Sequence, residues 1–132
     1  IAEALRFKHQ FGGAMRQAGI IAAAGIYALQ HNVDRLAEDH ANAQRFARLI
    51  AQIDGIEVAT DAIETNMVFF DVTGTGLSAP EVADRLLAAG VRIGAINERR
   101  MRAVTHLDVD AAGVEEAARA LAAVVEAAHQ PA

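Results

Sequence analysis

The spacing of apolar residues changes at about Gly55, and the change limits the folds that the 132 residues of this chain can adopt. In residues 33–53, before that point, apolar side chains recur three, four or seven positions apart, which places them on one face of a helix. These side chains are Leu36, Ala43, Phe46, Ile50 and Ile53. After Gly55, short runs rich in β-branched and aromatic residues alternate with charged positions, as they do in strands. A helical part followed by strands among helices predicts an α+β fold.

Two helices are expected before residue 33. Residues 1–9 suit the end of a helix, which the Gly12–Gly13 pair then stops. Its inward side chains are predicted to be Ile1, Leu5 and Phe7. Residues 15–30 form a second, apolar helix, and Asn32 is expected to cap the helix that follows. The most apolar segment, 18–29, is far shorter than the roughly 20 residues that span a bilayer, so we expect a buried helix and no membrane segment.

Four short segments are expected to form strands. They are 56–59 (IEVA), 67–72 (MVFFDV), 91–96 (VRIGAI) and 101–106 (MRAVTH). The second of these is so dense in apolar residues that burial on both faces is predicted. Ser78 and Glu81 have the spacing of a capping box, which opens a helix that ends at Gly90, and Asp110 caps a last helix that continues to about Ala128. The predicted architecture has two layers, a short and largely antiparallel sheet covered on one side by helices.

Composition argues against several classes of function. The net charge is −5 and the basic residues are scattered, so the cationic stripe of a DNA- or RNA-binding protein is missing. The chain has no cysteine, which excludes disulfides and thiolate metal sites. Its five histidines lack a ligand spacing such as HExxH, so no metal site is expected. The TGTG sequence lacks the lysine of a phosphate-binding loop and is interpreted as a turn.

Arg102 stands out because it lies within an otherwise apolar strand. Alternation along the segment 101–106 places Arg102 and His106 on one face of that strand. The planar guanidinium fork suits bidentate binding of a carboxylate. The competing interpretation is an internal salt bridge, to Asp108 or Asp71, and the residues alone leave both open.

Arg16 is the second candidate for anion binding. It follows the Gly12–Gly13 pair at the predicted start of a helix, where backbone N–H groups and the guanidinium together suit an anion. The competing interpretation is an exposed cation in the first helical turn.

Four stretches of the chain resemble a known family when they are taken together. In order, they are GGAMRQAGIIAAAGIYAL, RLAEDHANA, TNMVFFDV and MRAVTHLDV. At these intervals they resemble the C-terminal part of low-specificity L-threonine aldolases, which are fold-type I enzymes that use pyridoxal phosphate. The resemblance runs from about Leu5 to Ala128, and its most specific motifs are GGxMRQAG and RxVTHLDV.

The resemblance implies a fold, a domain division and a reaction. Residues 1–30 would be the end of a large domain and a linker helix, and residues 31–132 would be the small C-terminal α+β domain. The reaction would be the retro-aldol cleavage of L-threonine and L-allo-threonine to glycine and acetaldehyde, with pyridoxal phosphate as the electron sink. A related β-eliminating lyase and a non-catalytic interaction domain of the same fold are the alternatives.

The resemblance also assigns roles to residues. Arg102 would bind the substrate α-carboxylate, and Arg16 would lie near the cofactor phosphate, reaching from a neighbouring subunit. Gly12 and Gly13 would let the backbone approach that cofactor site, with Lys8 as an auxiliary cation. The lysine that the family links to its cofactor lies in an SKG motif, which is absent here, so no catalytic residue is expected in this segment.

The resemblance finally implies partners and a location. We expect a C-terminal portion of a longer chain, whose large domain carries the covalent lysine, and a homo-oligomer, specifically a tetramer, with shared active sites. The ligands would be pyridoxal phosphate and a small β-hydroxy amino acid. The expected location is the cytoplasm, and His106 is interpreted as structural.

Overall fold

The computed structural model describes residues 1–13 and 15–129, and the chain divides into two compact units. Unit 1 is Ile1–Arg35 and unit 2 is Leu36–Ala132. Unit 1 contains helices α1 (Ala2–Gln10) and α2 (Gly19–His31). The elements that could form a site on a sheet all lie in unit 2. The assignment of residues 1–30 to the end of a large domain and a linker helix stays a prediction.

The helices of unit 1 differ in detail from those predicted. α1 ends at Gln10, and Gly12 follows with a φ of +80°, a conformation that glycine adopts without strain, so the predicted glycine stop is confirmed. The predicted inward side chains of α1 are exposed: Ile1, Leu5 and Phe7. α2 begins at Gly19, four residues later than predicted. Asn32 ends α2, because its N–H bonds to the carbonyl of Ala28 and its backbone is close to helical rather than extended as an N-cap requires.

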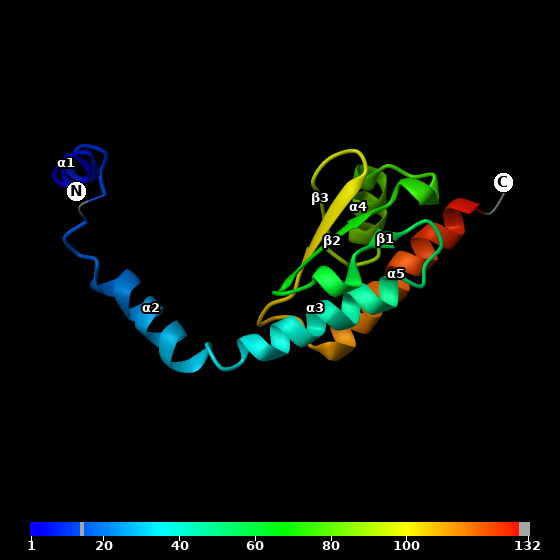
Figure 1. Cartoon of the computed structure of the whole chain (residues 1–132), viewed down its shortest axis with the longest axis horizontal. Helices are drawn as coiled ribbons and strands as arrows, with labels where there is room; N and C mark the ends of the chain where they lie inside the picture. The colour runs from blue at the N-terminus through cyan, green and yellow to red at the C-terminus, as the bar shows by residue number, and fades with distance from the viewer. Residues whose placement is uncertain (14, 130–132) are drawn as a thin grey trace. The chain divides into compact units, whose positions relative to one another are not determined.

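Unit 2 is an α+β fold with two layers. Its elements are α3 (Leu36–Ile50), β1 (Glu57–Val58), the 3₁₀ turns η1 (Thr60–Ala62) and η2 (Thr73–Thr75), β2 (Met67–Asp71), α4 (Ala79–Ala88), β3 (Gly94–Ala95), β4 (Arg100–Val104) and α5 (Ala111–His129). Within the described residues the four strands form one antiparallel sheet in the order β1-β2-β4-β3. Helices α3, α4 and α5 lie against one face of it (Figure 1). The predicted fold class is confirmed.

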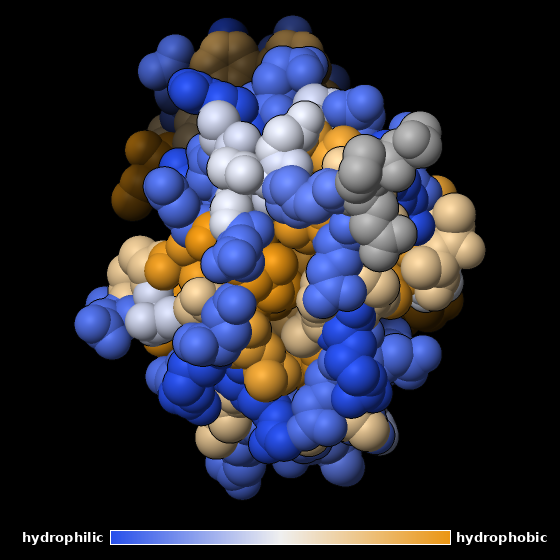
Figure 2. Space-filling model, turned by 90° about the vertical axis from the view of Figure 1, so that its right-hand side faces the viewer, coloured by the Kyte–Doolittle hydropathy of each residue, from blue (hydrophilic) through white to orange (hydrophobic). Residues whose placement is uncertain are grey.

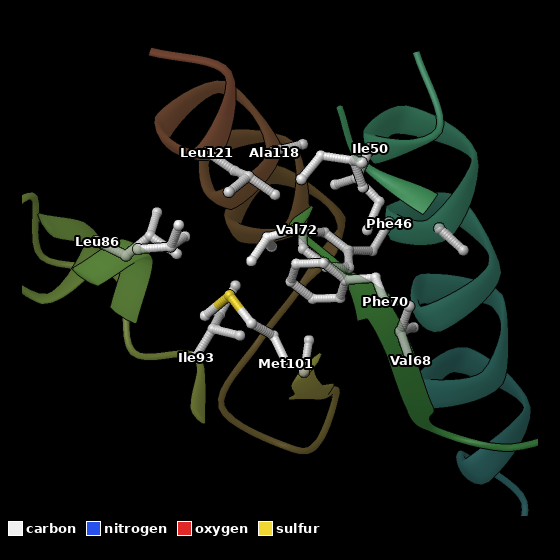
Figure 3. Close-up of a cluster of buried hydrophobic side chains, with 14 of the residues drawn as sticks. Phe46, Ile50, Val68, Phe70, Val72, Leu86, Ile93, Met101, Ala118 and Leu121 are labelled. Carbon is white, nitrogen blue, oxygen red and sulfur yellow. The ribbon is translucent and has the colours of Figure 1, made fainter. Parts of the chain in front are cut away.

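The core fills the space between these helices and the sheet. Figure 3 shows Phe70 and Met101 of the central strands pointing toward Leu86 of α4 and Leu121 of α5. The rings of Phe46 and Phe70 meet edge to face, with centroids 6.1 Å apart. Each such side chain contributes about 1.5–3 kcal/mol of hydrophobic stabilisation when it is fully buried, so this layer holds unit 2 together.

Burial on both faces of the second strand is a prediction that was wrong. Along β2, Val68 and Phe70 are buried, whereas Met67 and Phe69 are 41% and 37% exposed. The helices of unit 2 cover one face of the sheet only, so alternate apolar residues point away from the core. Apolar density in the sequence does not distinguish these two cases.

The caps predicted at Ser78 and at Asp110 are confirmed. Ser78 and Glu81 form a reciprocal capping box at the start of α4, with the Ser78 N–H donating to Glu81 Oε2 at 2.9 Å. These bonds, together with the nearby Arg85, lower the pKa of Glu81. Asp110 Oδ1 accepts from the N–H of Gly113 at 2.8 Å at the start of α5.

The TGTG sequence has a packing role. The loop that follows α3 and the turn η2 approach so closely that a Cβ on Gly74 would lie 2.6 Å from the Cα of Gly55. Gly55 itself has a φ of +84°. The predicted turn is therefore present, and its first glycine is required by this backbone contact.

Apolar surface is also present away from the sheet. Figure 2 shows hydrophobic side chains bordered by hydrophilic ones on the side of the molecule where α5 ends. At that end a hollow lies between α5 and the loop that follows α3, and its lining includes Ile53, Ala122 and Val125 together with Asp54 and Glu126. Among the described residues, no helix combines the length and the apolar character needed to cross a membrane.

Substituting Gly74→Ala tests the close approach of the two loops. The new methyl group would overlap backbone, so we expect a loss of about 1–3 kcal/mol in unfolding free energy, which is typical of overpacking. Thermal unfolding measures this loss. Gly113→Ala is the matched control, because its Cβ would meet Asp110 and Val109 at the ordinary distances of 3.5 and 3.6 Å. The close approach is refuted if the two variants unfold at the same temperature.

Candidate functional site

Strand β4 presents Arg102 on the uncovered face of the sheet. Met101 and Ala103 are buried against the helices, and the side chains between and beside them point the other way. We call this uncovered surface the open face. Its exposed residues from the two central strands are Met67, Phe69, Arg100, Arg102 and Val104. The alternation predicted for the segment 101–106 is confirmed, because His106 is exposed and Thr105 is buried.

The strands on either side of β4 leave room next to Arg102. Phe69 of β2 is its partner on one side, and Gly94 of β3 is its partner on the other. Gly94 has no side chain, and a Cβ built there would meet, among the described residues other than its chain neighbours, only the carbonyl oxygen of Arg102 at 4.0 Å. An aromatic side chain, Phe69, therefore lies on one side of Arg102, and the other side, at Gly94, carries no side chain.

A second guanidinium lies close to that ring. The guanidinium carbon of Arg100 is 5.3 Å from the centroid of Phe69, within range of a cation–π interaction. Phe69 and Arg100, together with Ile96 and Asn97, line one shallow hollow. On the opposite side, the same pair lines a second hollow with Glu57 and other residues next to β1. Two cations and one aromatic ring thus occupy the centre of the open face.

Neither salt bridge considered for Arg102 is present among the described residues. Asp71 Oδ1 accepts instead from the hydroxyl of Thr73 and, at 2.8 Å, from the Thr73 N–H. These bonds, with Arg99 and Arg100 nearby, lower the pKa of Asp71. Arg102 therefore has no ion pair with either aspartate among the described residues.

Polar contacts fix the end of β4 just beyond Arg102. The buried Thr105 hydroxyl donates to the backbone carbonyl of Asp39 in α3 at 2.7 Å. Asn66 Nδ2 donates to the carbonyl of Thr105 at 2.8 Å, and the Thr105 N–H donates to the carbonyl of Asn66 at 3.0 Å. His106 Nδ1 lies 3.7 Å from the carboxylate of Asp39, which is fully buried. The structural interpretation of His106 is consistent with this contact and stays a prediction.

The other predicted site residues lie in unit 1. The N–H of Gly13 donates to the carbonyl of Lys8 at 2.7 Å, and a Cβ on Gly13 would lie 3.0 Å from that carbonyl, so the turn closes tightly on the end of α1. Arg16 lies three residues before α2 and does not start it. The free N–H groups of a helix N-terminus therefore do not support anion binding at Arg16. Arg102 belongs to unit 2, so the predicted site residues are divided between the two units.

Sequence reasoning did not find three features of the open face. These are Phe69, Gly94 and Arg100, each of which was considered only as part of a strand or turn. Their signal is the strand register, which pairs residues far apart in the chain. Within the described residues, no group of three or more histidine, aspartate or glutamate side chains is placed to hold a metal ion.

Comparison with known proteins identifies the family. Residues 1–73, which are more than half of the chain, match the family model described as beta-eliminating lyase. The chain belongs to this family. Membership of the beta-eliminating lyase family implies pyridoxal phosphate as the cofactor.

Named relatives agree with this assignment, and a solved structure shares the fold. The chain is 42% identical over 118 residues to the low specificity L-threonine aldolase of Escherichia coli K12, covering 89% of this chain and 33% of that protein. It is 36% identical over 115 residues to low-specificity L-threonine aldolase 1 of Arabidopsis thaliana, covering 86% and 32%. A structure of MppP soaked with the product 2-ketoarginine has the same fold, with a TM-score of 0.59, 16% identity and coverage of 75% and 30%. The chain thus spans about a third of the length of these relatives.

The described residues fit one end of the cofactor and not its covalent attachment. The only lysine, Lys8, is exposed in the last turn of α1, where the backbone folds back on it through Gly13. An exposed lysine is not enclosed in the desolvated pocket that activates an attaching amine. Lys8 and the exposed Arg16 carry the positive charge that a phosphate requires.

Replacing Thr73 tests the electrostatics at the edge of the open face. A lowered pKa means that ionised Asp71 stabilises the fold at neutral pH, and that this stabilisation is lost as the pH falls through the folded pKa. In Thr73→Val the hydroxyl donor is gone, so we expect the pKa of Asp71 to rise toward its ordinary value of 3.8. Carboxyl carbon NMR titration measures the change, with the other aspartates as internal controls. An unchanged Asp71 titration would contradict the assigned cause.

Proposed function

We propose that this segment belongs to a pyridoxal-phosphate-dependent threonine aldolase. The reaction is the retro-aldol cleavage of L-threonine and L-allo-threonine to glycine and acetaldehyde. The observation that carries the proposal is Arg102, exposed on the open face, free of ion pairs among the described residues and beside space left by Gly94. Similarity to proteins named as threonine aldolases supports the choice of substrate.

Arg102 supplies the binding of the α-carboxylate in this proposal. A guanidinium presents two parallel N–H donors to a carboxylate, which fixes both its position and its plane. A β-strand held on both sides by neighbouring strands is a rigid base for such a contact. The bound cofactor supplies the electron sink for cleavage of the Cα–Cβ bond. The role of Arg102 is to orient the substrate so that this bond is presented to the sink.

Unit 1 contributes to the phosphate end of the cofactor in the same proposal. Arg16 and Lys8 neutralise the phosphate charge, with Arg16 acting across a subunit boundary, and the tight Gly12–Gly13 turn lets the backbone approach. The remaining partners are the rest of the same chain, which carries the covalent lysine, and further copies that complete a tetramer. We place the enzyme in the cytoplasm. The exposed apolar side chains of α1 and α2 support burial against such partners.

β-Elimination is the second candidate, because the matching family model carries that description. The two reactions break different bonds of a substrate held by the same carboxylate contact. Retro-aldol cleavage of threonine releases acetaldehyde and leaves glycine, whereas elimination releases ammonia and leaves a keto acid. Assaying the complete protein for both sets of products separates them, and ammonia without acetaldehyde would overturn the proposed function.

Arg102 variants of the complete protein test the carboxylate contact. Losing a charge-assisted pair costs about 1.5–3 kcal/mol, so Arg102→Gln is expected to raise the KM for L-threonine roughly 10- to 100-fold, with a smaller change in kcat. Arg102→Lys keeps the charge but loses the fork, and an intermediate effect is expected.

The control for these variants is Arg119→Gln. Arg119 is exposed on α5, away from the sheet, and lies 3.9 Å from Glu115 of the same helix. Steady-state kinetics on all three variants is the measurement. Equal KM values for Arg102→Gln and Arg119→Gln would show that Arg102 does not bind the substrate.

A further inference from the structure

Phe69 and Arg102 form a close cross-strand pair on the open face. The Thr105 N–H bonds to the Asn66 carbonyl and the Val72 N–H bonds to the Arg99 carbonyl, which fixes the hydrogen-bonding positions of the β2–β4 ladder. By alternation, Phe69 and Arg102 occupy a position without mutual hydrogen bonds. At such positions the Cα atoms are closest and the side chains lie against one another. The register therefore places the Phe69 side chain directly opposite that of Arg102 on this face.

Arg100 contacts the same ring from the next position on that face of β4. Its guanidinium carbon is 5.3 Å from the ring centroid. Its cross-strand partner is Asp71, whose carboxylate is bound to Thr73, and the described residues give no ion pair between Asp71 and Arg100. Arg100 therefore rests on an aromatic face rather than on a carboxylate.

This arrangement places one aromatic ring between two cations of the same strand. With Arg100 over Phe69, the ring is restrained and that part of its face is occupied. If the guanidinium of Arg102 folded onto that part of the Phe69 ring, the like charge of Arg100 would repel it. The Phe69 side chain thus lies opposite that of Arg102, while the guanidinium of Arg102 stays available to bind an anion.

We propose that Phe69 and Arg100 are positioning residues for Arg102, which hold its guanidinium ready for the substrate carboxylate. This inference rests on the proposed function, because it takes Arg102 as the group that binds the carboxylate. Neither residue touches the reacting atoms. Their effect comes from restricting the rotamers of Arg102 before the substrate arrives, which lowers the entropy lost on binding.

The test compares ligands with and without a carboxylate in the complete enzyme. Glycine carries the α-carboxylate, whereas glycinamide has the same amine and a neutral amide. Inhibition constants for both are measured in Phe69→Leu, Phe69→Tyr and Arg100→Gln. Met67→Leu is the matched control, because Met67 lies on the same strand and the same face, opposite Val104. Thermal unfolding of each variant shows whether it is folded.

A positioning role predicts a loss that is selective for the carboxylate. Phe69→Leu and Arg100→Gln are each expected to weaken glycine about three- to tenfold and to leave glycinamide unchanged, with KM for L-threonine rising more than kcat falls. Phe69→Tyr retains the ring and is expected to bind glycine as the parent does. The double variant Phe69→Leu/Arg100→Gln is expected to weaken glycine binding by less than the product of the two single-variant effects, because the two side chains act as one unit.

Each other outcome overturns the inference. Equal weakening of glycine and glycinamide would indicate a general structural role, and parent-like glycine binding in both Phe69→Leu and Arg100→Gln would remove any role. Arg102→Gln in the same assay separates this failure from failure of the proposed function. If Arg102→Gln weakens glycine and the other variants do not, only the positioning role is refuted. If Arg102→Gln has no effect on glycine, the carboxylate site itself is refuted.

Discussion

One-sided burial of the antiparallel sheet determines the rest of this structure. The helices α3, α4 and α5 cover the face that carries Phe70 and Met101, so every intervening side chain of β2 and β4 must point outward. Arg102 is exposed because its neighbours Met101 and Ala103 are buried. A shift of one residue in register would bury a guanidinium without a partner and expose the core, so the burial pattern strongly specifies the register.

Several polar contacts hold that register at the end of β4. The backbone and hydroxyl of Thr105 are bonded to Asn66 and to α3, so the strand is tied both to its neighbour and to the helical layer. At the other end of β2, Asp71 closes the turn η2 through Thr73, and Gly74 packs on Gly55. These contacts lie outside the open face, yet they decide which side chains reach it. The fold thus fixes the candidate site through its flanking turns.

Local sequence patterns predicted much of this fold, because their physical causes are local. The capping box at Ser78, the Asp110 cap and the alternation around Arg102 each depend on residues only a few positions apart. The start of α2 and the role of Asn32 were predicted wrongly, since an apolar run does not mark its own first turn. Exposure of Met67 and Phe69 was missed because it depends on which face the distant helices cover.

The candidate site was predictable only in part for the same reason. Arg102 was identified from its own strand, and the family resemblance supplied its role. Phe69 and Gly94 come next to it through pairing with two other strands, which no single segment encodes. Arg100 was hidden in a charged turn, and its contact with Phe69 depends on that pairing as well. Non-local register is therefore the information that the sequence patterns lacked.

In the proposed function, this segment contributes an arginine that binds the carboxylate and no lysine that attaches the cofactor. The most direct measurement is borohydride reduction of the complete native protein, followed by peptide mapping and intact mass determination. We predict a reduced pyridoxyl group on a lysine outside these 132 residues, with Lys8 unmodified. A pyridoxyl group on Lys8, or a native protein that carries none, would contradict the account.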